Sequence, residues 1–151
     1  MNLYGHGFLG RGAPVGADVN LLVQIGLGLV LLAGMWLARR GFYRAHGAGQ
    51  ASVFILAVVM TVLWMAPAFR DVYADGLARG AWNRVNLTVA MHVALGSGSL
   101  LLGAWVVLVA GTPLVPARFR FENYRVWMRS LLTLWWVTIA FGVLAYWLAT
   151  L

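Results

Sequence analysis

One histidine, His92, lies among small residues in an otherwise apolar stretch, "AMHVALGSGSLLLG" at residues 90–103. An ionisable side chain inside a membrane-length apolar segment is by default a candidate functional site. A neutral imidazole could ligate the iron of a haem b or a copper ion, or bond a quinone carbonyl. The alternative is structural, because a histidine in a helix seam can also hydrogen-bond between packed helices. Both interpretations stay open at this point.

Residues from other apolar stretches are expected at the depth of His92. Depth can be counted from the ends of those stretches at about 1.5 Å per helical residue. This count places Gln24, Trp64 and Tyr146 in one layer with His92. These four are the candidate cofactor-binding residues. Met65 is one residue away from that layer and is the candidate second metal ligand beside His92.

Small and polar residues recur at helical spacing on three of the apolar stretches. The three stripes are Asn20, Gln24 and Gly28; Thr88, His92, Gly96, Ser99 and Gly103; and Thr138, Gly142 and Tyr146. Polar groups that face lipid lack partners, so the three faces are expected to point at one another. Small residues at this spacing also let helices pack closely, which accounts for the stripes without any ligand.

These residues belong to four apolar segments that are long enough to cross a membrane as helices. The segments are 19–38, 51–69, 87–110 and 130–151, each near the roughly 20 residues that span a hydrocarbon core. Of the 151 residues, 62% are hydrophobic and 10% are charged, which lies outside the range of soluble domains. Because short links favour antiparallel neighbours, the predicted fold class is all-α, an integral membrane antiparallel four-helix bundle.

The first segment is expected to begin after Asp18, a favourable helix N-cap residue. Residues 1–18 would then form a glycine-rich extracytoplasmic N-terminal segment, and residues 19–151 the bundle. On this division none of the four spans contains a carboxylate, so a proton relay of the acidic kind is not expected.

The arginines predict how the chain is oriented. All eleven basic residues are arginines; seven lie in the links after the first and third spans, and four lie on the other side. The positive-inside rule therefore predicts a multi-pass protein of the bacterial cytoplasmic membrane with both termini extracytoplasmic. Without an aromatic-interleaved basic patch, the charge of +7 indicates lipid headgroups as the partner and no nucleic acid.

A second candidate site lies on the predicted cytoplasmic side. His46, Arg125 and Arg129 belong to basic links that could form a pocket for lipid phosphate or haem propionates. Headgroup anchoring explains the same residues without a pocket. His46 and His92 lie near opposite faces of the membrane in this topology, so they could not ligate one haem iron together.

Other chemistry is sparse in this sequence. There is no cysteine, which excludes disulfides and thiolate sites. No phosphate-binding loop, zinc motif or nucleophile elbow is present, so the chain is not expected to be a stand-alone enzyme.

The stretches "RRGFYRAHGAGQASVFIL", "MHVALGSGSLLLGAWVVL" and "YRVWMRSLLTLWWVTIAFGVLAYWL" resemble a family of small four-span bacterial membrane proteins, domain of unknown function 420. The resemblance covers roughly residues 19–149. His46, His92, Arg125 and Arg129 match the pattern of the family, whereas Tyr124 stands where the family usually has a further histidine. The resemblance implies a context of haem-copper terminal oxidase maturation.

The residues and the resemblance together predict an accessory protein of a respiratory-type complex that handles haem, copper or quinone and contacts other membrane subunits. The alternative is a purely structural small subunit of a larger respiratory or photosynthetic membrane complex. The abundant tryptophan and the small-residue seams favour that alternative.

Overall fold

The computed structural model describes residues 5–111, 115–116, 118, 120 and 122–151, and within these residues all regular elements are helical. In chain order they are α1 (Val15–Arg39), α2 (Tyr43–Met60), η1 (Thr61–Met65), α3 (Ala66–Phe69), η2 (Arg70–Ala74), α4 (Asp75–Ala78), α5 (Arg84–Gly111) and α6 (Tyr124–Ala149). The prediction of an all-helical chain is confirmed for the described residues.

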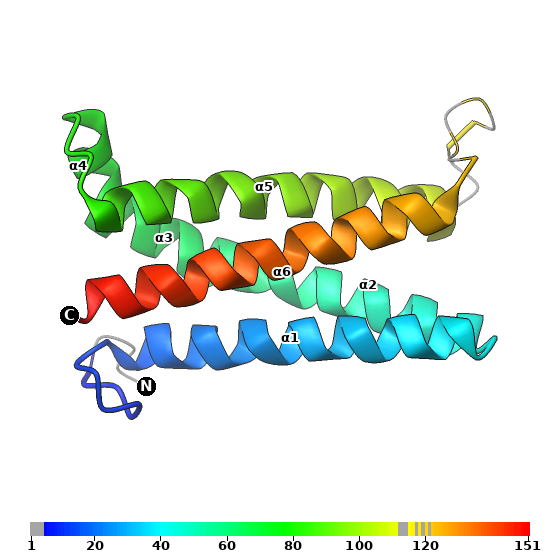
Figure 1. Cartoon of the computed structure of the whole chain (residues 1–151), viewed down its shortest axis with the longest axis horizontal. Helices are drawn as coiled ribbons and strands as arrows, with labels where there is room; N and C mark the ends of the chain where they lie inside the picture. The colour runs from blue at the N-terminus through cyan, green and yellow to red at the C-terminus, as the bar shows by residue number, and fades with distance from the viewer. Residues whose placement is uncertain (1–4, 112–114, 117, 119, 121) are drawn as a thin grey trace.

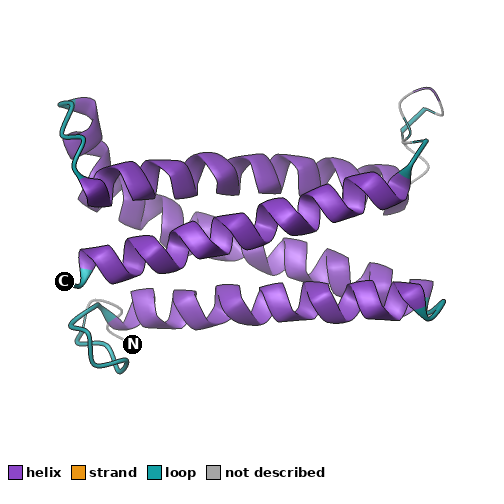
Figure 2. Ribbon diagram, in the orientation of Figure 1, coloured by secondary structure: helices purple, strands orange, loops and turns teal. Residues whose placement is uncertain are grey.

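Four long helices lie side by side, and successive helices run in opposite directions (Figure 1). The neighbours are α1 with α2, α2 with α5, α5 with α6, and α6 with α1. Loops are confined to the two ends (Figure 2). We call the end with the N-terminal segment and the last turn of α6 the termini end. All four helices have the length and hydropathy needed to cross a membrane.

The second long helix runs without a break from Tyr43 to Ala78 and is longer than the predicted 51–69. The prediction was based on the apolar residues alone, which identify only the part of a helix that could lie in lipid. It therefore left out the more polar turns at both ends of this helix. Two π-helical segments, η1 and η2, lie on either side of Pro67. Proline cannot donate a backbone hydrogen bond, and π turns accommodate such local irregularity.

The predicted N-cap role of Asp18 is wrong. α1 begins at Val15 with Pro14 as its N-cap, so Asp18 lies inside the helix, and the expectation that no span contains a carboxylate fails for α1. Proline has no N–H and its fixed φ suits a helix start. The carboxylate turns away from its own helix and accepts hydrogen bonds from the backbone N–H groups of Phe8 (2.6 Å) and Leu9 (2.8 Å).

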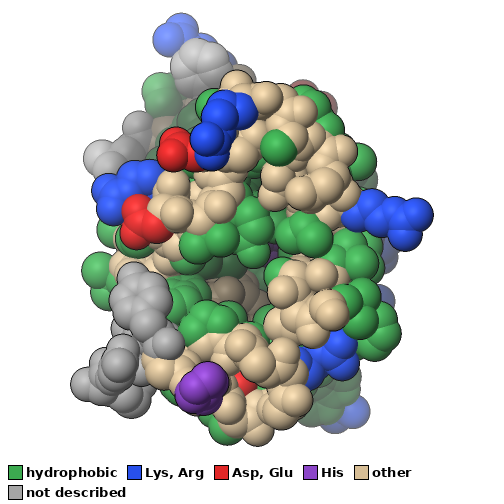
Figure 3. All heavy atoms as spheres, turned by 90° about the vertical axis from the view of Figure 1, so that its left-hand side faces the viewer, with side chains coloured by type: hydrophobic (Ala, Val, Ile, Leu, Met, Phe, Trp, Pro, Cys, Tyr) green, Lys and Arg blue, Asp and Glu red, His purple; other side chains and the backbone are tan. Residues whose placement is uncertain are grey.

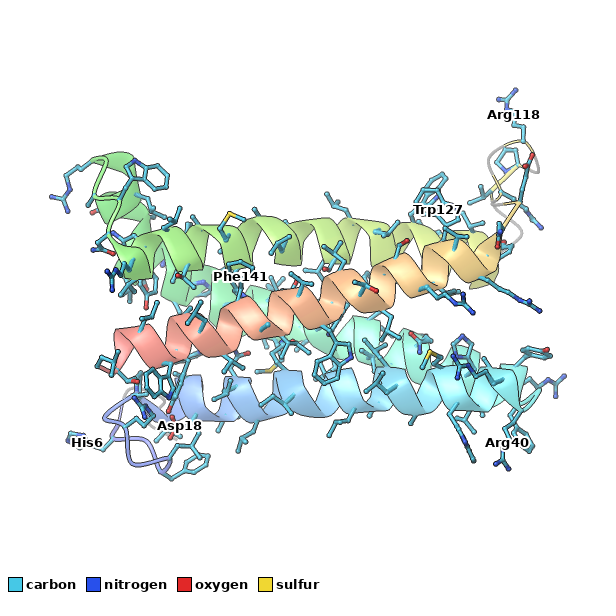
Figure 4. All side chains as sticks on the ribbon, viewed as in Figure 1. His6, Asp18, Arg40, Arg118, Trp127 and Phe141 are labelled. Atoms are coloured by element: carbon cyan, nitrogen blue, oxygen red, sulfur yellow. The ribbon has the colours of Figure 1, made fainter. Side chains whose placement is uncertain are left out.

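The N-terminal segment is held against the end of α6. Tyr146 donates its phenolic hydrogen to the other oxygen of Asp18 at 2.6 Å, and Asp18 is only 1% exposed. Arg11 donates to the Thr150 hydroxyl at 3.0 Å and stacks on the Trp147 ring with its guanidinium carbon 4.5 Å from the ring centre. Figure 4 shows Asp18 at the start of α1, directly below the end of α6.

The hydrophobic core lies deeper in the molecule, between α1, α2 and α6. It consists of Leu27, Leu31, Val53, Ala57, Trp135 and Ile139. Gly28 lets α6 approach α1 closely, since a Cβ there would lie 2.7 Å from the Ile139 Cδ1 atom and 3.0 Å from the Trp136 ring. Such contacts are tighter than real side chains show, so a side chain at this position would force the Ile139 methyl group and the Trp136 ring to shift.

Tyr146→Phe should destabilise the protein, because it removes a short hydrogen bond to a buried carboxylate. We expect a loss of about 1.5–3 kcal/mol in the free energy of unfolding. Titration with sodium dodecyl sulfate in mixed micelles measures it. Tyr43→Phe is the matched control, since Tyr43 is 71% exposed. Equal stability of the two variants would contradict the role of the Asp18–Tyr146 bond.

Two glycines of α1 provide a second test. Gly28→Ala should cost about 1–3 kcal/mol of stability through overpacking against α6. Gly26→Ala should be neutral or stabilise by up to about 1 kcal/mol, because a Cβ at Gly26 meets no atom within 4 Å. The same detergent titration compares them, and a loss at Gly26 as large as at Gly28 would exclude this packing explanation.

Candidate functional site

A cavity of about 760 Å³ lies between the helices toward the termini end. Its walls come from α1, the η1–η2 region of the second helix, α5, α6 and residues 11–14 of the N-terminal segment. Figure 3 looks onto the termini end and shows hydrophobic side chains around a hollow at the centre. Ligand sites are commonly concave and mostly apolar, with a few polar groups that orient the ligand.

The cavity brings together the predicted site residues from four helices. His92, Gln24, Tyr146, Trp64 and Met65 all line it. The other members of the three polar stripes that line it are Asn20, Gly96, Ser99, Thr138 and Gly142. The prediction that these three faces point at one another is confirmed for these members.

The His92 ring is held by a hydrogen bond across the α5–α6 seam. Its Nδ1 atom lies 2.9 Å from the backbone carbonyl oxygen of Thr138. A carbonyl cannot donate, so Nδ1 must carry the hydrogen and donate it. In the neutral ring Nε2 then holds a free lone pair. No described residue hydrogen-bonds to Nε2, and this atom is not sealed off from its surroundings.

Gln24 of α1 contacts Met65 across the cavity wall. The amide Nε2 of Gln24 lies 3.9 Å from the Met65 sulfur, and the hydroxyl of Thr61 lies 3.6 Å from the same sulfur. A thioether only accepts hydrogen bonds, so the NH₂ side of the amide faces it. One N–H of the amide is used in this contact, and its second N–H and its carbonyl oxygen make no hydrogen bond to a described residue.

The predicted single layer is divided into two depths. Near the mouth, Tyr146 bonds to Asp18 and the Trp64 ring lies against Gly16, where a Cβ would overlap it. Gln24 lies deeper in the cavity, about halfway along α1 between Asp18 and Gly28. Both the second helix and α6 run obliquely to α1 and α5, so equal residue counts do not give equal depths (Figure 1).

His92 belongs to the deeper level together with Gln24. The His92 ring packs on Gly142, whose Cβ, if present, would be 2.9 Å from Cε1 of the ring. On α6, Gly142 lies between Tyr146 and Ile139. Tyr146 contacts the start of α1 at Asp18, and Ile139 contacts α1 at Gly28, one turn beyond Gln24. His92 and Gln24 therefore project into the cavity at similar depth from α5 and α1.

The second candidate site is not joined to this cavity. His46, Arg125 and Arg129 do not line it. The Nδ1 atom of His46 lies 2.8 Å from the carbonyl oxygen of Gly34, so this histidine ties α2 to α1 at the end opposite the termini. Figure 4 places Arg40, Arg118 and Trp127 at that same end. His46 and His92 are thus far apart along the bundle, as the sequence predicts.

Two features of the site were not predicted. The sequence singled out Asp18 only as a cap, and it did not place residues 11–14 on the cavity wall. The sequence signal for the burial of Asp18 was weak. The Phe8 and Leu9 amides that bond to its carboxylate lie ten and nine positions earlier in the chain. Positive φ angles at Gly10 and Gly12, 71° and 75°, allow the chain to turn back in this way.

The metal-ligating side chains of the cavity limit which metal could bind there. Among the described residues no three histidine, cysteine, aspartate or glutamate side chains are grouped as metal ligands. Among the described residues that line the cavity, the candidate ligands are His92 and Met65, and the Met65 sulfur lies 3.9 Å from the Gln24 amide nitrogen. A haem, which supplies four nitrogen ligands of its own, is compatible with one histidine, whereas a bare copper ion is poorly served.

Comparisons with protein-family models, with curated proteins and with solved structures found no match. The resemblance to domain of unknown function 420 therefore remains a prediction from the sequence.

The proton position on His92 can be tested directly. In mildly alkaline buffer, ¹⁵N nuclear magnetic resonance of histidine-labelled protein should show the neutral ring protonated at Nδ1 and bare at Nε2. His92→Leu assigns the signal, and His46 should show the same tautomer, since it bonds to the Gly34 carbonyl through Nδ1. A proton on Nε2 of His92 would invalidate the hydrogen bond to Thr138.

Proposed function

We propose that this chain is a membrane-embedded accessory protein that binds a small, largely apolar cofactor in the cavity at its termini end. The observation that carries the proposal is His92, which lines a cavity of about 760 Å³ and whose Nε2 atom bonds to no described residue. An ionisable residue within a span that faces a cavity is the usual mark of a ligand site. Haem and quinone compounds fit the apolar walls and the single imidazole better than copper alone.

We further propose that the four helices span a bacterial cytoplasmic membrane as an antiparallel bundle with both termini outside. Support comes from the four apolar helices and from the seven arginines in the two links and the adjoining helix turns at the end opposite the termini. In this orientation the cavity lies in the outer half of the bilayer. A ligand could then reach it from the outer leaflet or from the outer surface.

The proposed setting is a respiratory-type complex, in which the chain would assist an oxidase by delivering or holding its cofactor. This rests on the sequence resemblance to domain of unknown function 420. The family histidine that Tyr124 replaces would start α6, at the end away from the cavity. A ligand site centred on His92 therefore does not depend on it.

A purely structural subunit is the second candidate function, and one set of contacts favours it. His92 bonds to the Thr138 carbonyl, and the hydroxyls of Ser99 and Thr138 lie 3.2 Å apart in the same seam. These contacts join α5 to α6 without any ligand. On this proposal the cavity would be covered by a neighbouring subunit and no cofactor would depend on His92.

Purification from native membranes in mild detergent distinguishes the two functions. Oxidised and reduced visible spectra and a lipid extract would identify haem or quinone, and the co-purifying polypeptides would be identified in the same sample. We expect a cofactor whose amount falls at least about tenfold in His92→Leu, which removes the anchoring contact. His46→Leu is the matched control and should retain the cofactor.

A structural subunit predicts a different result. A colourless, quinone-free protein that arrives with larger subunits, unchanged by His92→Leu, would establish the structural function and eliminate the cofactor site.

A further inference from the structure

We propose that the cavity ligand is an anionic amphiphile, whose carboxylate bonds to Arg11 at the termini end and whose apolar body extends inward toward His92. The inference rests on the proposed function and specifies the chemical class of the ligand in the same site. It selects compounds that carry a carboxylate on an apolar body, such as a haem or a fatty acid, over neutral quinones.

The first observation is the charge of the cavity lining. Among the described residues that line the cavity, Arg11 is the one arginine, and no aspartate or glutamate lies beside it. Farther in, His92 and Gln24 offer hydrogen-bonding groups without a fixed charge. The lining therefore has a net positive charge at the termini end, and an anionic group on the ligand would balance it.

The carboxylate of Asp18 does not pair with this arginine. Asp18 is 1% exposed and does not line the cavity. Its oxygens accept hydrogen bonds from the backbone N–H groups of Phe8 and Leu9 and from the Tyr146 hydroxyl. Arg11 forms no ion pair with a described residue. The guanidinium is therefore left to a partner from outside the chain.

Two contacts hold the Arg11 guanidinium at the end of α6. Its Nε atom donates to the Thr150 hydroxyl at 3.0 Å, and its central carbon lies 4.5 Å from the centre of the Trp147 ring. Thr150 lines the cavity and donates its own hydrogen to the Tyr146 carbonyl at 2.9 Å, so its oxygen is available to accept from Arg11. The guanidinium is thus fixed beside the cavity wall.

The remaining donors of Arg11 have the geometry that a carboxylate needs. The N–H groups on its two terminal nitrogens make no hydrogen bond to a described residue. These nitrogens form a planar fork, which binds the two oxygens of a carboxylate at once. Because Nε is already bonded to Thr150, the fork is restricted to one orientation before a ligand arrives.

The other walls suit an apolar body attached to that carboxylate. Trp64, Phe69 and Trp135 line the cavity, together with aliphatic side chains such as Leu100 and Ile139. Burying apolar surface is favourable, whereas a charge without a partner is costly to bury. An amphiphile therefore binds with its charge at Arg11 and its body inside. The volume of about 760 Å³ lies within the range of small-molecule sites.

The test compares each acid with its methyl ester, which keeps the apolar body and removes the charge. One pair is haemin and its dimethyl ester, read by the Soret band; the other is cis-parinaric acid and methyl parinarate, read by fluorescence. The full chain is used in lipid nanodiscs, with empty nanodiscs as the blank. In at least one pair, we expect the acid to bind at least about tenfold more tightly than the ester.

Variants of Arg11 then assign the charge. Arg11→Gln should bring acid and ester to within about threefold of each other, and Arg11→Lys should keep a preference for the acid because it keeps the charge. A structural defect would weaken acid and ester alike, so the ratio of their dissociation constants isolates the charge. Arg79→Gln is the matched control, since Arg79 is exposed and does not line the cavity.

The two pairs also distinguish the sources of the carboxylate. Selective binding of haemin supports a tetrapyrrole, and selective binding of cis-parinaric acid supports a lipid-derived acid. Equal binding of acid and ester in both pairs, or a preference that survives in Arg11→Gln, overturns the inference and leaves the proposed function standing. A native cofactor without an acidic group does the same. If no probe binds and the native preparation carries no cofactor, both proposals fail.

Discussion

The structure depends on one constraint: a polar group among apolar surroundings needs a partner within the protein. The helices satisfy their own backbones, but Asp18, His46 and His92 require partners elsewhere. Asp18 takes two backbone N–H groups and the Tyr146 hydroxyl. Each histidine donates to a backbone carbonyl of the neighbouring helix. These bonds select which faces of the helices meet, since the apolar side chains alone would pack in many ways.

The candidate cavity lies toward the termini end of the core, where the helices stand farther apart. Deeper in the bundle, glycine and aliphatic side chains bring α1, α2 and α6 into close contact. Beyond Met60 the second helix continues through η1 and η2 around Pro67 and reaches α1 through the long side chains of Trp64 and Met65. Side chains that span a wider gap leave space between them, and that space is the candidate site.

The proposed chemistry depends on tautomer and amide orientation, which ordinary lists of polar residues do not reveal. His92 and Gln24 each contain both a donor and an acceptor. The Thr138 carbonyl takes the one N–H of the neutral His92 ring, whereas Gln24 gives one N–H to the Met65 sulfur and keeps a second. His92 therefore offers an acceptor at Nε2, which is more specific than its side-chain type suggests.

The sequence alone predicted the helices that the structure has in the described residues, because its apolar segments have the length of a membrane-spanning helix and are about twice as long as a barrel strand. It also identified His92, Gln24, Tyr146, Trp64 and Met65, because helical spacing and segment ends are local properties that can be counted. It could not show that α1 begins at Val15, that Asp18 is buried by the N-terminal segment, or that Tyr146 lies at a shallower depth than Gln24. Those features depend on how helices cross and on bonds between residues distant in the chain, which only the tertiary structure decides.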